Sequence, residues 1–495
     1  MKTLSRNFNS LFIGNSWVVP TSGEIQQIVN PATEKVIGTA PVGGTTEVDQ
    51  AVAAAREAFD SGPWPRMAPK QRAQYMQKFK DALQGRREEI VDLIVAEVGA
   101  TKMLAEAMHF DMIMNVFQFC IDSILKRSSI QPASISVHPN YYSGKTLASY
   151  VKVSEPVGVV ASITPFNFPY FLNIAKLAPA LCAGCTVVLK PSPLVPLQAL
   201  IIGEVALEVG LPAGVLNIVT GDVDVGQALV ADARVDMVSF TGSDQVGASI
   251  MAQAASTLKR VHLELGGKSA LIICEDADVE AAAVAGFNQI IVQCGQGCVL
   301  QTRHIVHNSV RGKYVELIRA MAKQLKIGDP ADPSVGMGPL ISEAQRQKVE
   351  RYIQLGLDSG ATLVTGGDRP KHMSKGFFVE PTFFDNVDNS SVIAQEEIFG
   401  PVGVVIGFDS ESEAVRLAND SAYGLGGGVF STNTGKAFEI AMQMRTGGVS
   451  INGGGGILNP EVPFGGYKRS GIGREFGEEG LNEYLETKVI EFHAG

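Results

Sequence analysis

Apolar positions recur with two different periods along the chain, and the change of period separates its regions. Between residues 46 and 125, apolar side chains return every three or four positions, which predicts a series of amphipathic helices. Residues 133–153 instead alternate apolar and polar positions on either side of a group of turn-forming residues. This second pattern predicts a protruding β-hairpin, a shape suited to pairing between subunits.

From residue 157 onward, short apolar runs alternate with helical stretches, which is typical of an α/β fold with a parallel, doubly wound sheet. Several of the runs are apolar almost without interruption, as expected for strands covered on both faces. The strands predicted in this block are 157–163, 185–190, 215–220, 237–241 and 260–264. A second alternating block follows from residue 269 to about 452, and the chain ends on a predicted strand.

Composition narrows the class of protein. The chain has 495 residues, 45% of them hydrophobic, so it can bury large cores, and its length predicts two to four domains. A formal net charge of −10 argues against nucleic acid and anionic membranes as partners. The chain opens without the apolar core of a secretory signal, and it has no run of 18 apolar residues. Its six cysteines are too few for a disulfide scaffold, which indicates reduced thiols in the cytoplasm.

Three stretches contain residues that could carry chemistry on a carbonyl group. Cys298 lies among small residues in QCGQGCVLQTR, where a thiol is accessible for nucleophilic attack. Glu264 follows a strand-like run and precedes two glycines, a position suited to a general base. Asn167, between aromatic residues and prolines, could donate a hydrogen bond to an oxyanion. Each residue taken alone also fits an ordinary structural role: a buried cysteine, a solvated glutamate or a turn asparagine.

Two further stretches could bind a phosphorylated ligand. In SFTGSDQVGASI an apolar strand runs into Gly242, and Gly247 opens the next helix, where backbone amides meet anions. The spacing between these glycines is longer than in the GxGxxG fingerprint. In VVLKPSP, Lys190 ends a buried strand at its carboxyl end, where ligands bind in open α/β sheets. A lysine at a strand end is also often merely exposed.

The order and the amino-acid sequences of these stretches resemble the aldehyde dehydrogenase superfamily from about residue 23 to residue 488. Further stretches match the family in the same order. They are EEIFGPV at 396–402, NDSAYGLGGGVF at 419–430, ING at 451–453 and PFGGYKRSGIGRE at 463–475. Several long motifs in the right order make the resemblance specific.

The resemblance implies a doubly wound cofactor domain (residues 1–128 and 156–265), an α/β catalytic domain (266–465) and a small β oligomerisation hairpin (129–155 and 476–495). It implies a homodimer or homotetramer whose substrate is a small-molecule aldehyde.

The resemblance also implies a division of roles among single residues. Cys298 would be the nucleophile, Glu264 the general base for hydrolysis, and Asn167 with the Cys298 backbone amide the oxyanion hole. Lys176 would tune the proton network near the base. NAD or NADP would be the cofactor, with no metal. Cofactor contacts are expected from Lys190, Ser192, Gly226, Phe240, Thr241, Gly242, Ser243, Gly247, Leu265, Glu397 and Phe399. Substrate contacts are expected from Phe166, Tyr170, Phe171, Val299, Leu300 and Phe464.

Some positions depart from the family pattern. Pro193 stands where the family usually has a glutamate that binds the adenine ribose and repels a 2′-phosphate, so NAD and NADP both stay open. Gln293 replaces a common asparagine, Phe166 a common tryptophan, and Cys294 adds a second thiol near the nucleophile. The aromatic and aliphatic substrate positions favour an uncharged, hydrophobic aldehyde.

Two alternatives to hydrolytic aldehyde oxidation remain at the level of the sequence. One is a CoA-acylating semialdehyde dehydrogenase, a branch that lacks the glutamate found here as Glu264. The other is a non-catalytic structural relative, which joint retention of Cys298, Glu264 and Asn167 disfavours.

Overall fold

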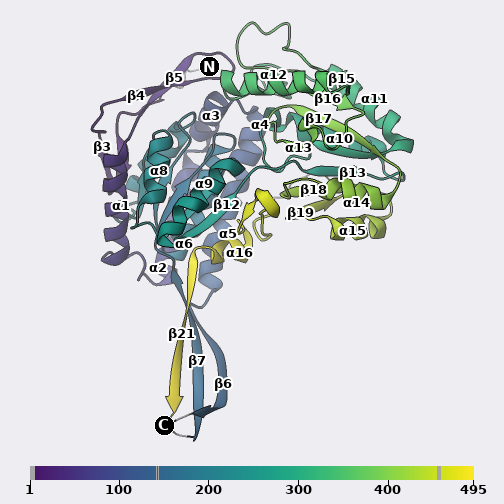
Figure 1. Ribbon diagram of the computed structural model, residues 1–495. Helices are drawn as coiled ribbons and strands as arrows, with labels where there is room; N and C mark the ends of the chain where they lie inside the picture. Colours follow the sequence, from purple (N-terminus) through teal and green to yellow (C-terminus); the bar gives the residue numbers. More distant parts are fainter. Residues whose placement is uncertain (1–5, 141, 143, 454–458, 495) are drawn as a thin grey trace.

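The chain folds into two α/β units, each built on a mainly parallel sheet, with a three-stranded antiparallel sheet projecting from the first unit (Figure 1). This computed structural model describes residues 6–140, 142, 144–453 and 459–494. Both the α/β class and the projecting hairpin agree with the patterns in the sequence.

The first sheet has eight strands, and its five central strands are parallel. In spatial order they are β20 (Gly471–Ile472), β12 (Arg260–Glu264), β11 (Met237–Thr241), β8 (Val159–Ile163), β9 (Thr186–Lys190), β10 (Leu216–Ile218), β2 (Leu11–Ile13) and β3 (Ser16–Val18). Numbered by their order in the chain, the parallel strands run 3-2-1-4-5, as in the dinucleotide-binding doubly wound fold. The strand order therefore reverses between β8 and β11.

Helices cover both faces of this sheet because alternate strand residues point to opposite sides. Val187 and Leu189 pack with α6 and α7, whereas Val188 packs with α1 and α8 on the other face. The helices of this unit are α1 (Thr45–Asp60), α2 (Pro69–Gly85), α3 (Arg87–Val98), α4 (Lys102–Leu104), α5 (Met112–Lys126), α6 (Pro169–Ala183), α7 (Leu197–Glu208), α8 (Val223–Ala231), α9 (Asp244–Ala254) and the short α16 (Gly477–Asn482). A π-helical segment, Ala105–Asp111, joins α4 to α5.

The second sheet has seven strands, all parallel except the edge strand β15. In spatial order they are β15 (Thr362–Thr365), β16 (Thr382–Asp385), β17 (Val402–Phe408), β14 (Arg303–His307), β13 (Ala270–Ile273), β18 (Gly426–Phe430) and β19 (Gly448–Ile451). Its helices are α10 (Val279–Ile291), α11 (Asn308–Gln324), α12 (Glu343–Asp358), α13 (Val392–Gln395), α14 (Glu411–Asn419) and α15 (Thr434–Gln443).

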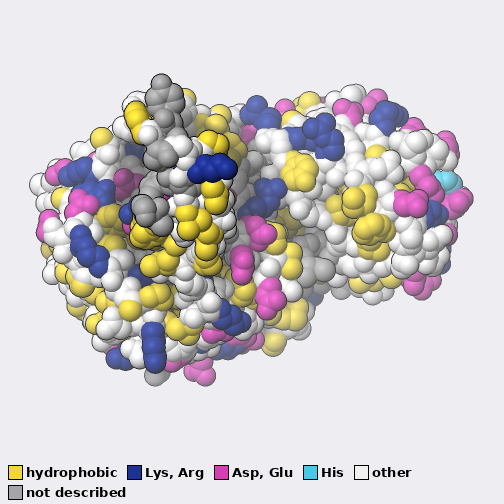
Figure 2. Space-filling view, turned by 90° about the horizontal axis from the view of Figure 1, so that it is seen from below, with side chains coloured by type: hydrophobic (Ala, Val, Ile, Leu, Met, Phe, Trp, Pro, Cys, Tyr) yellow, Lys and Arg dark blue, Asp and Glu magenta, His cyan; other side chains and the backbone are white. Residues whose placement is uncertain are grey.

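The projecting sheet joins β6 (Ile130–Asn140), β7 (Gly144–Pro156) and the C-terminal β21 (Leu485–Ala494). It leaves large apolar side chains exposed, among them Ile135, Val137, Val489 and Phe492. Figure 2, which views the molecule from the hairpin side, shows hydrophobic side chains gathered beside the projection. A fourth, small sheet near the N-terminus joins β1 (Arg6–Asn7), β5 (Val36–Pro41) and β4 (Ile25–Val29).

Over the part of the chain that the structure describes, no helix combines the length and the apolar character that a membrane span needs.

Candidate active site

The candidate residues gather where the two sheets face each other end to end. Glu264 closes β12, and the following turn enters β13 of the second sheet through Gly266 and Gly267. A Cβ added at Gly267 would lie 2.4 Å from the carbonyl oxygen of Cys298, and one added at Gly266 would lie 2.4 Å from Glu397 Oε2. These two glycines therefore let Cys298 and Glu397 come close to the end of the first sheet.

Cys298 lies in a tightly folded loop between α10 and β14. Three consecutive residues, Gln293, Cys294 and Gly295, have left-handed backbone conformations, with φ values of 48°, 52° and 71°. A Cβ at Gly295 would lie 2.1 Å from the carbonyl oxygen of Gly400, so the loop presses directly on the chain before β17. Cys298 is partly accessible, whereas the other five cysteines are buried. A thiol in this position can meet a ligand.

The electrostatic surroundings of Cys298 favour the neutral thiol. Burial raises the pKa of Cys298 above its ordinary value, and the carboxyl groups of Glu397 and Glu264 raise it further. Because the thiolate is the attacking form, the proton must leave before or during attack.

Asn167 follows β8 and is buried. Its Nδ2 donates a hydrogen bond of 2.9 Å to the carbonyl oxygen of Gln296, two residues before Cys298. An amide nitrogen carries two protons, so one remains to donate to a ligand. The bond ties the amide to the nucleophile loop.

Glu264 is buried, and neither of its carboxyl oxygens has a hydrogen-bond partner among the described residues. A Cβ at Gly465 would lie 2.8 Å from Glu264 Oε1, so glycine at 465 leaves the space that the carboxyl group occupies. Burial raises the pKa of Glu264, and the neighbouring Glu475 raises it further, against the opposing charges of Lys176 and Arg474. A carboxyl group with a raised pKa is suited to take up a proton.

Lys176, on α6, is fully buried and paired. Its Nζ lies 2.9 Å from Glu475 Oε1 and donates to Ser239 Oγ at 3.2 Å. Ser239, Glu475 and the neighbouring His262 were not predicted as site residues. A signal for His262 was present, because residues two apart on a strand share a face, which places His262 beside Glu264.

Helix α9 begins shortly after the carboxyl end of β11, beside the point where the strand order reverses. Ser243 caps α9, and its side chain accepts a hydrogen bond from the backbone amide of Val246. A Cβ at Gly247 would lie 2.7 Å from Leu265 Cδ2, so the glycine permits close packing of the helix on the chain after β12. Thr241 Oγ1 is buried without a hydrogen-bond partner among the described residues. Free amides at a helix start and an unpartnered hydroxyl suit a phosphate-bearing ligand.

Lys190 ends β9, which is separated from β11 by β8 in the first sheet. Its ammonium group makes one long contact, 3.4 Å to the carbonyl oxygen of Pro191. Burial lowers the pKa of Lys190 to about 8, against the opposing charges of Asp222 and Asp224. Gly226 faces the lysine stem, and a Cβ there would lie 3.7 Å from it. The adjacent Ser192 and the strand residue Phe240 are buried.

Glu397 and Phe399 lie on the segment that leads into β17. Glu397 Oε1 accepts a hydrogen bond of 3.0 Å from the backbone amide of Gly267. Burial raises the pKa of Glu397 to about 7, opposed by that hydrogen bond and by nearby lysines. Phe399 has a left-handed φ of 60°, and its ring meets Phe166 edge to face at 5.7 Å.

The expected substrate residues divide into three groups. Val299 and Phe464 line a cavity of about 400 Å³, and Phe166 packs on Phe399. Leu300 and Phe171 are buried, and Phe171 packs on Phe476 instead of facing that cavity.

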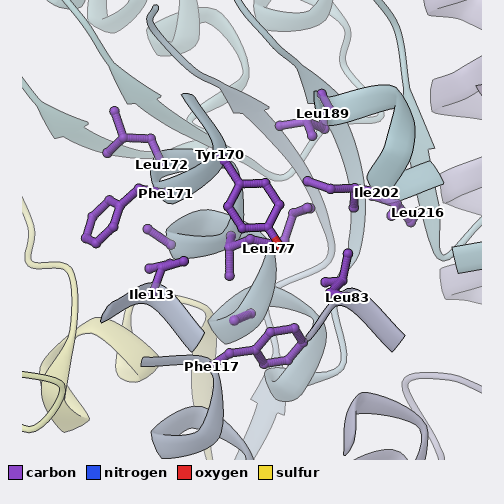
Figure 3. Packing of buried hydrophobic residues seen from close by; sticks show 14 of the residues in the cluster. Leu83, Ile113, Phe117, Tyr170, Phe171, Leu172, Leu177, Leu189, Ile202 and Leu216 are labelled. Carbon is purple, nitrogen blue, oxygen red and sulfur yellow. The ribbon is translucent and has the colours of Figure 1, made fainter. Parts of the chain in front are cut away.

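Tyr170 differs most from its expected place. It is fully buried in the core of the first unit, where it stacks on Phe110 at 5.3 Å between centroids. Figure 3 shows it among Leu177, Phe117 and Ile202. Tyr170 follows Pro169, which opens α6, and its side chain packs in this core and is not among the described residues that line the cavity.

The fold and the crevice together define an α/β enzyme of the dinucleotide-binding type with a cysteine at the meeting point of its two sheets. Residues 17–490 match the aldehyde dehydrogenase family. An aldehyde dehydrogenase of Mycobacterium tuberculosis, crystallised with NAD+, is 42% identical, with 98% of each chain covered and a TM-score of 0.92. Aldehyde dehydrogenase C of Pseudomonas syringae, crystallised as a cysteine-to-alanine variant with NAD+ and octanal, is 39% identical, with 99% of this chain and 96% of that one covered and a TM-score of 0.91. The 3-succinoylsemialdehyde-pyridine dehydrogenase of a Pseudomonas species is 39% identical over 99% of this chain and 100% of its own.

The chain belongs to the aldehyde dehydrogenase family. This confirms the family, the α/β fold class and the NAD(P)-dependent dehydrogenase class predicted from the sequence.

Proposed function

We propose that this enzyme oxidises an uncharged, hydrophobic aldehyde to the carboxylic acid by a hydrolytic route. The main support for this substrate class is the cavity of about 400 Å³ next to the nucleophile loop. It extends from Val299, which follows Cys298, to Gly465, which touches Glu264. None of the described residues that line it is charged. A charged substrate would lose its hydration there without gaining a partner, which is unfavourable.

The chemistry assigned to the chain proceeds through Cys298. Its sulfur bonds to the aldehyde carbon, and the carbonyl electron pair moves to oxygen, where Asn167 Nδ2 and the Cys298 backbone amide donate hydrogen bonds. The tetrahedral carbon then loses its hydrogen as hydride, for which a bound NAD or NADP would be the acceptor that no side chain provides, and the carbonyl bond re-forms to leave a thioester on Cys298. Glu264 then takes a proton from water while the water oxygen attacks the thioester carbon, and the sulfur leaves as the acid forms.

The crevice fits a dinucleotide. Ser243 and Gly242 begin helix α9, Lys190 presents an ammonium group with a single long contact, and Thr241 has an unpartnered hydroxyl. We assign the pyrophosphate to the start of α9, the adenine ribose to Lys190, and the nicotinamide ribose to Glu397. Ser192, Gly226, Phe240, Gly247 and Leu265 would complete the adenosine side, and Phe399 would support the nicotinamide ring.

The related enzymes differ in substrate, so family membership alone does not fix it. One relative was crystallised with octanal, and another is named for a semialdehyde of pyridine. The uncharged lining here supports an aldehyde of the octanal kind.

A panel of octanal, benzaldehyde, succinic semialdehyde and betaine aldehyde, each with NAD and NADP, tests this by absorbance of the reduced cofactor. We expect kcat/KM for the uncharged aldehydes to exceed that for the charged ones by at least about tenfold, the factor that 1.4 kcal/mol supplies. A preference for a charged aldehyde would refute the substrate class.

The CoA-acylating route is tested in the same assay by adding CoA and separating the products. Glu264 beside the cavity supports hydrolysis, so we expect the free acid at all CoA concentrations. An acyl-CoA product would favour the alternative.

We also propose that the projecting sheet joins copies of the chain into a homodimer or homotetramer in the cytoplasm. The support is the row of exposed apolar side chains on β6 and β21. Light scattering of the purified protein reads the mass directly, and a monomer would contradict the proposal.

A further inference from the structure

The polar groups beside Glu264 form a network that the mechanism above does not use. Strands β11 and β12 are in register, so Ser239 lies opposite His262 and Thr241 opposite Glu264. His262 and Glu264 are two residues apart and share one face of β12. The His262 imidazole therefore lies between Ser239 on one side and Glu264 on the other.

Distances define this arrangement. His262 Nδ1 is 3.2 Å from Ser239 Oγ, and His262 Nε2 is 3.7 Å from Glu264 Oε1. The second distance is slightly too long for a hydrogen bond, so both atoms lack a partner within the described structure. A Cβ at Gly473 would lie 2.3 Å from His262 Cδ2, so the chain packs tightly against the Nε2 edge of the ring. The ring has little freedom to turn away from Glu264.

The contacts of Ser239 favour one tautomer of the His262 imidazole. A hydroxyl has one proton and two acceptor positions, and Ser239 Oγ meets Lys176 Nζ, Tyr484 Oη and His262 Nδ1. The ammonium group of Lys176 can only donate. If Tyr484 also donates, Ser239 must give its proton to His262 Nδ1. In that arrangement every hydroxyl proton lies in an observed contact, and the neutral imidazole carries its proton on Nε2, facing Glu264.

We propose that His262 is a positioning residue whose Nε2–H donates to the Glu264 carboxylate and keeps it ionised and aimed at the thioester. The proposal rests on the proposed role of Glu264 as general base. A shift of a few tenths of an ångström closes the contact, and catalytic hydrogen bonds are often long before substrate binds. Burial and the positive charges of Lys176 and Arg474 lower the pKa of His262, so the ring stays neutral at physiological pH. The other ionisable groups that face the pair come from α6, the nucleophile loop and the C-terminal segment: Lys176, Cys298, Arg474, Glu475, Glu483 and Tyr484.

Two substitutions at one position separate this role from a structural one. In His262→Asn the amide oxygen takes the place of Nδ1 and accepts from Ser239, but the side chain is too short to reach Glu264. In His262→Gln the amide nitrogen takes the place of Nε2 and keeps the donor to Glu264. We expect the acidic limb of the kcat profile to move up by about one pH unit in His262→Asn, and to stay near its original position in His262→Gln. His262→Asn should also accumulate acyl-enzyme, visible as a burst of reduced cofactor.

The difference between the two acidic limbs is the deciding quantity. If the acidic limbs of the kcat profiles of both variants lie at the same pH, whatever the rates, the proposal is overturned. A structural role would not distinguish the two imidazole nitrogens. A measurement on the unaltered enzyme covers the case in which a variant does not fold: NMR of 15N-histidine-labelled protein should find His262 protonated on Nε2. A proton on Nδ1 would equally overturn it. Glu264→Gln serves as the reference: if that variant turned over normally, the proposed base would be wrong, whereas a burst there with no effect at His262 would reject His262 alone.

Discussion

The strands of the two sheets face the active site with opposite ends. The first sheet presents the carboxyl ends of β8, β9, β11 and β12, which is where ligands bind in open α/β sheets. The second sheet presents the amino ends of β13, β14, β17 and β18, and Cys298 lies in the loop that enters β14. Loops that leave the first sheet therefore form the binding surface, and loops that enter the second sheet bring the nucleophile to it.

This difference explains the glycines at the boundary. The loops that enter strands of the second sheet must pass close to the end of the first sheet. A side chain at the point of contact would keep such a loop at a distance. Gly266, Gly267 and Gly295 each face a backbone or carboxyl oxygen at a distance that no Cβ tolerates. A side chain at Gly267 would push the nucleophile loop away from the end of the first sheet, one at Gly266 would displace the Glu397 carboxyl group, and one at Gly295 would separate the loop from the chain before β17.

Cys298→Ala is the strongest test of the division between the two sheets. If the entering loops carry the chemistry and the leaving loops the binding, turnover should be lost by at least about 10⁴-fold while cofactor affinity is retained. Steady-state rates and titration with NAD, followed by protein fluorescence, measure the two properties separately. Cys294→Ala is the matched control, because Cys294 is a buried thiol four residues away. Normal turnover in Cys298→Ala, or loss in the control alone, would assign the nucleophile elsewhere.

Glu264→Gln tests the residue at which the chain crosses from the first sheet to the second. Glutamine keeps the shape and removes the basicity, so hydrolysis should slow by about a thousandfold. One equivalent of reduced cofactor should form in a burst, and mass spectrometry of quenched enzyme should find the acyl group on Cys298.

The pH dependence sharpens the same test. Because burial and Glu475 raise the pKa of Glu264, the basic form is lost at a higher pH than for an ordinary carboxyl group, and activity should fall as the pH drops through that range. Glu483→Gln is the comparison: the Glu483 charge also raises the pKa of Glu264, so its removal should move the loss of activity to a slightly lower pH and leave hydrolysis intact. A folded Glu264→Gln enzyme without burst or loss of rate would exclude the base.

Most of the first sheet could be predicted from the sequence, because its strands are apolar runs bounded by turn residues. Strand β11 was predicted at residues 237–241 with both ends correct. Strand β18 was not predicted: its sequence, GGGVF, has little strand propensity, and it forms because β13 and β19 pair with it on either side. Helix α12 is a long amphipathic helix that the patterns between residues 326 and 402 did not reveal.

The site was predictable to a similar, uneven extent. Cys298, Glu264 and Asn167 were found through motif resemblance, and the structure places Glu264 near Cys298 and Asn167 on the nucleophile loop through its bond to Gln296. Tyr170 was expected at the substrate and lies in the core, because motif spacing gives position along the chain and not the direction of a side chain. Glu475 lies some 200 residues from Glu264 in the sequence, and only the folded chain brings it to Lys176.

Asn167→Ala tests whether the loops that leave the first sheet contribute only to binding. Asn167 leaves β8 of the first sheet, yet its assigned role is to stabilise the oxyanion. Loss of one such donor costs about a hundredfold in kcat with little change in cofactor affinity. Asn173→Ala is the control, because Asn173 is a buried amide nearby that bonds to Thr164 and Gln198. Equal losses in both variants would indicate a packing role, and a selective rise in the cofactor dissociation constant would move Asn167 to the binding side.

Pro193→Glu tests the binding side alone. Lys190 ends β9 close to Asp222 and Asp224, and Pro193 follows in the same turn. A glutamate there would repel the 2′-phosphate of NADP and accept hydrogen bonds from the ribose hydroxyls of NAD. Two unit charges about 6 Å apart in partly exposed surroundings interact by about 1–2 kcal/mol, so the ratio of kcat/KM for NAD over NADP should rise about tenfold. Leu194→Glu places the same charge at the neighbouring, more exposed position and should change the ratio less. Equal ratios in the parent and in Pro193→Glu would show that the carboxylates around Lys190, and not residue 193, select the cofactor.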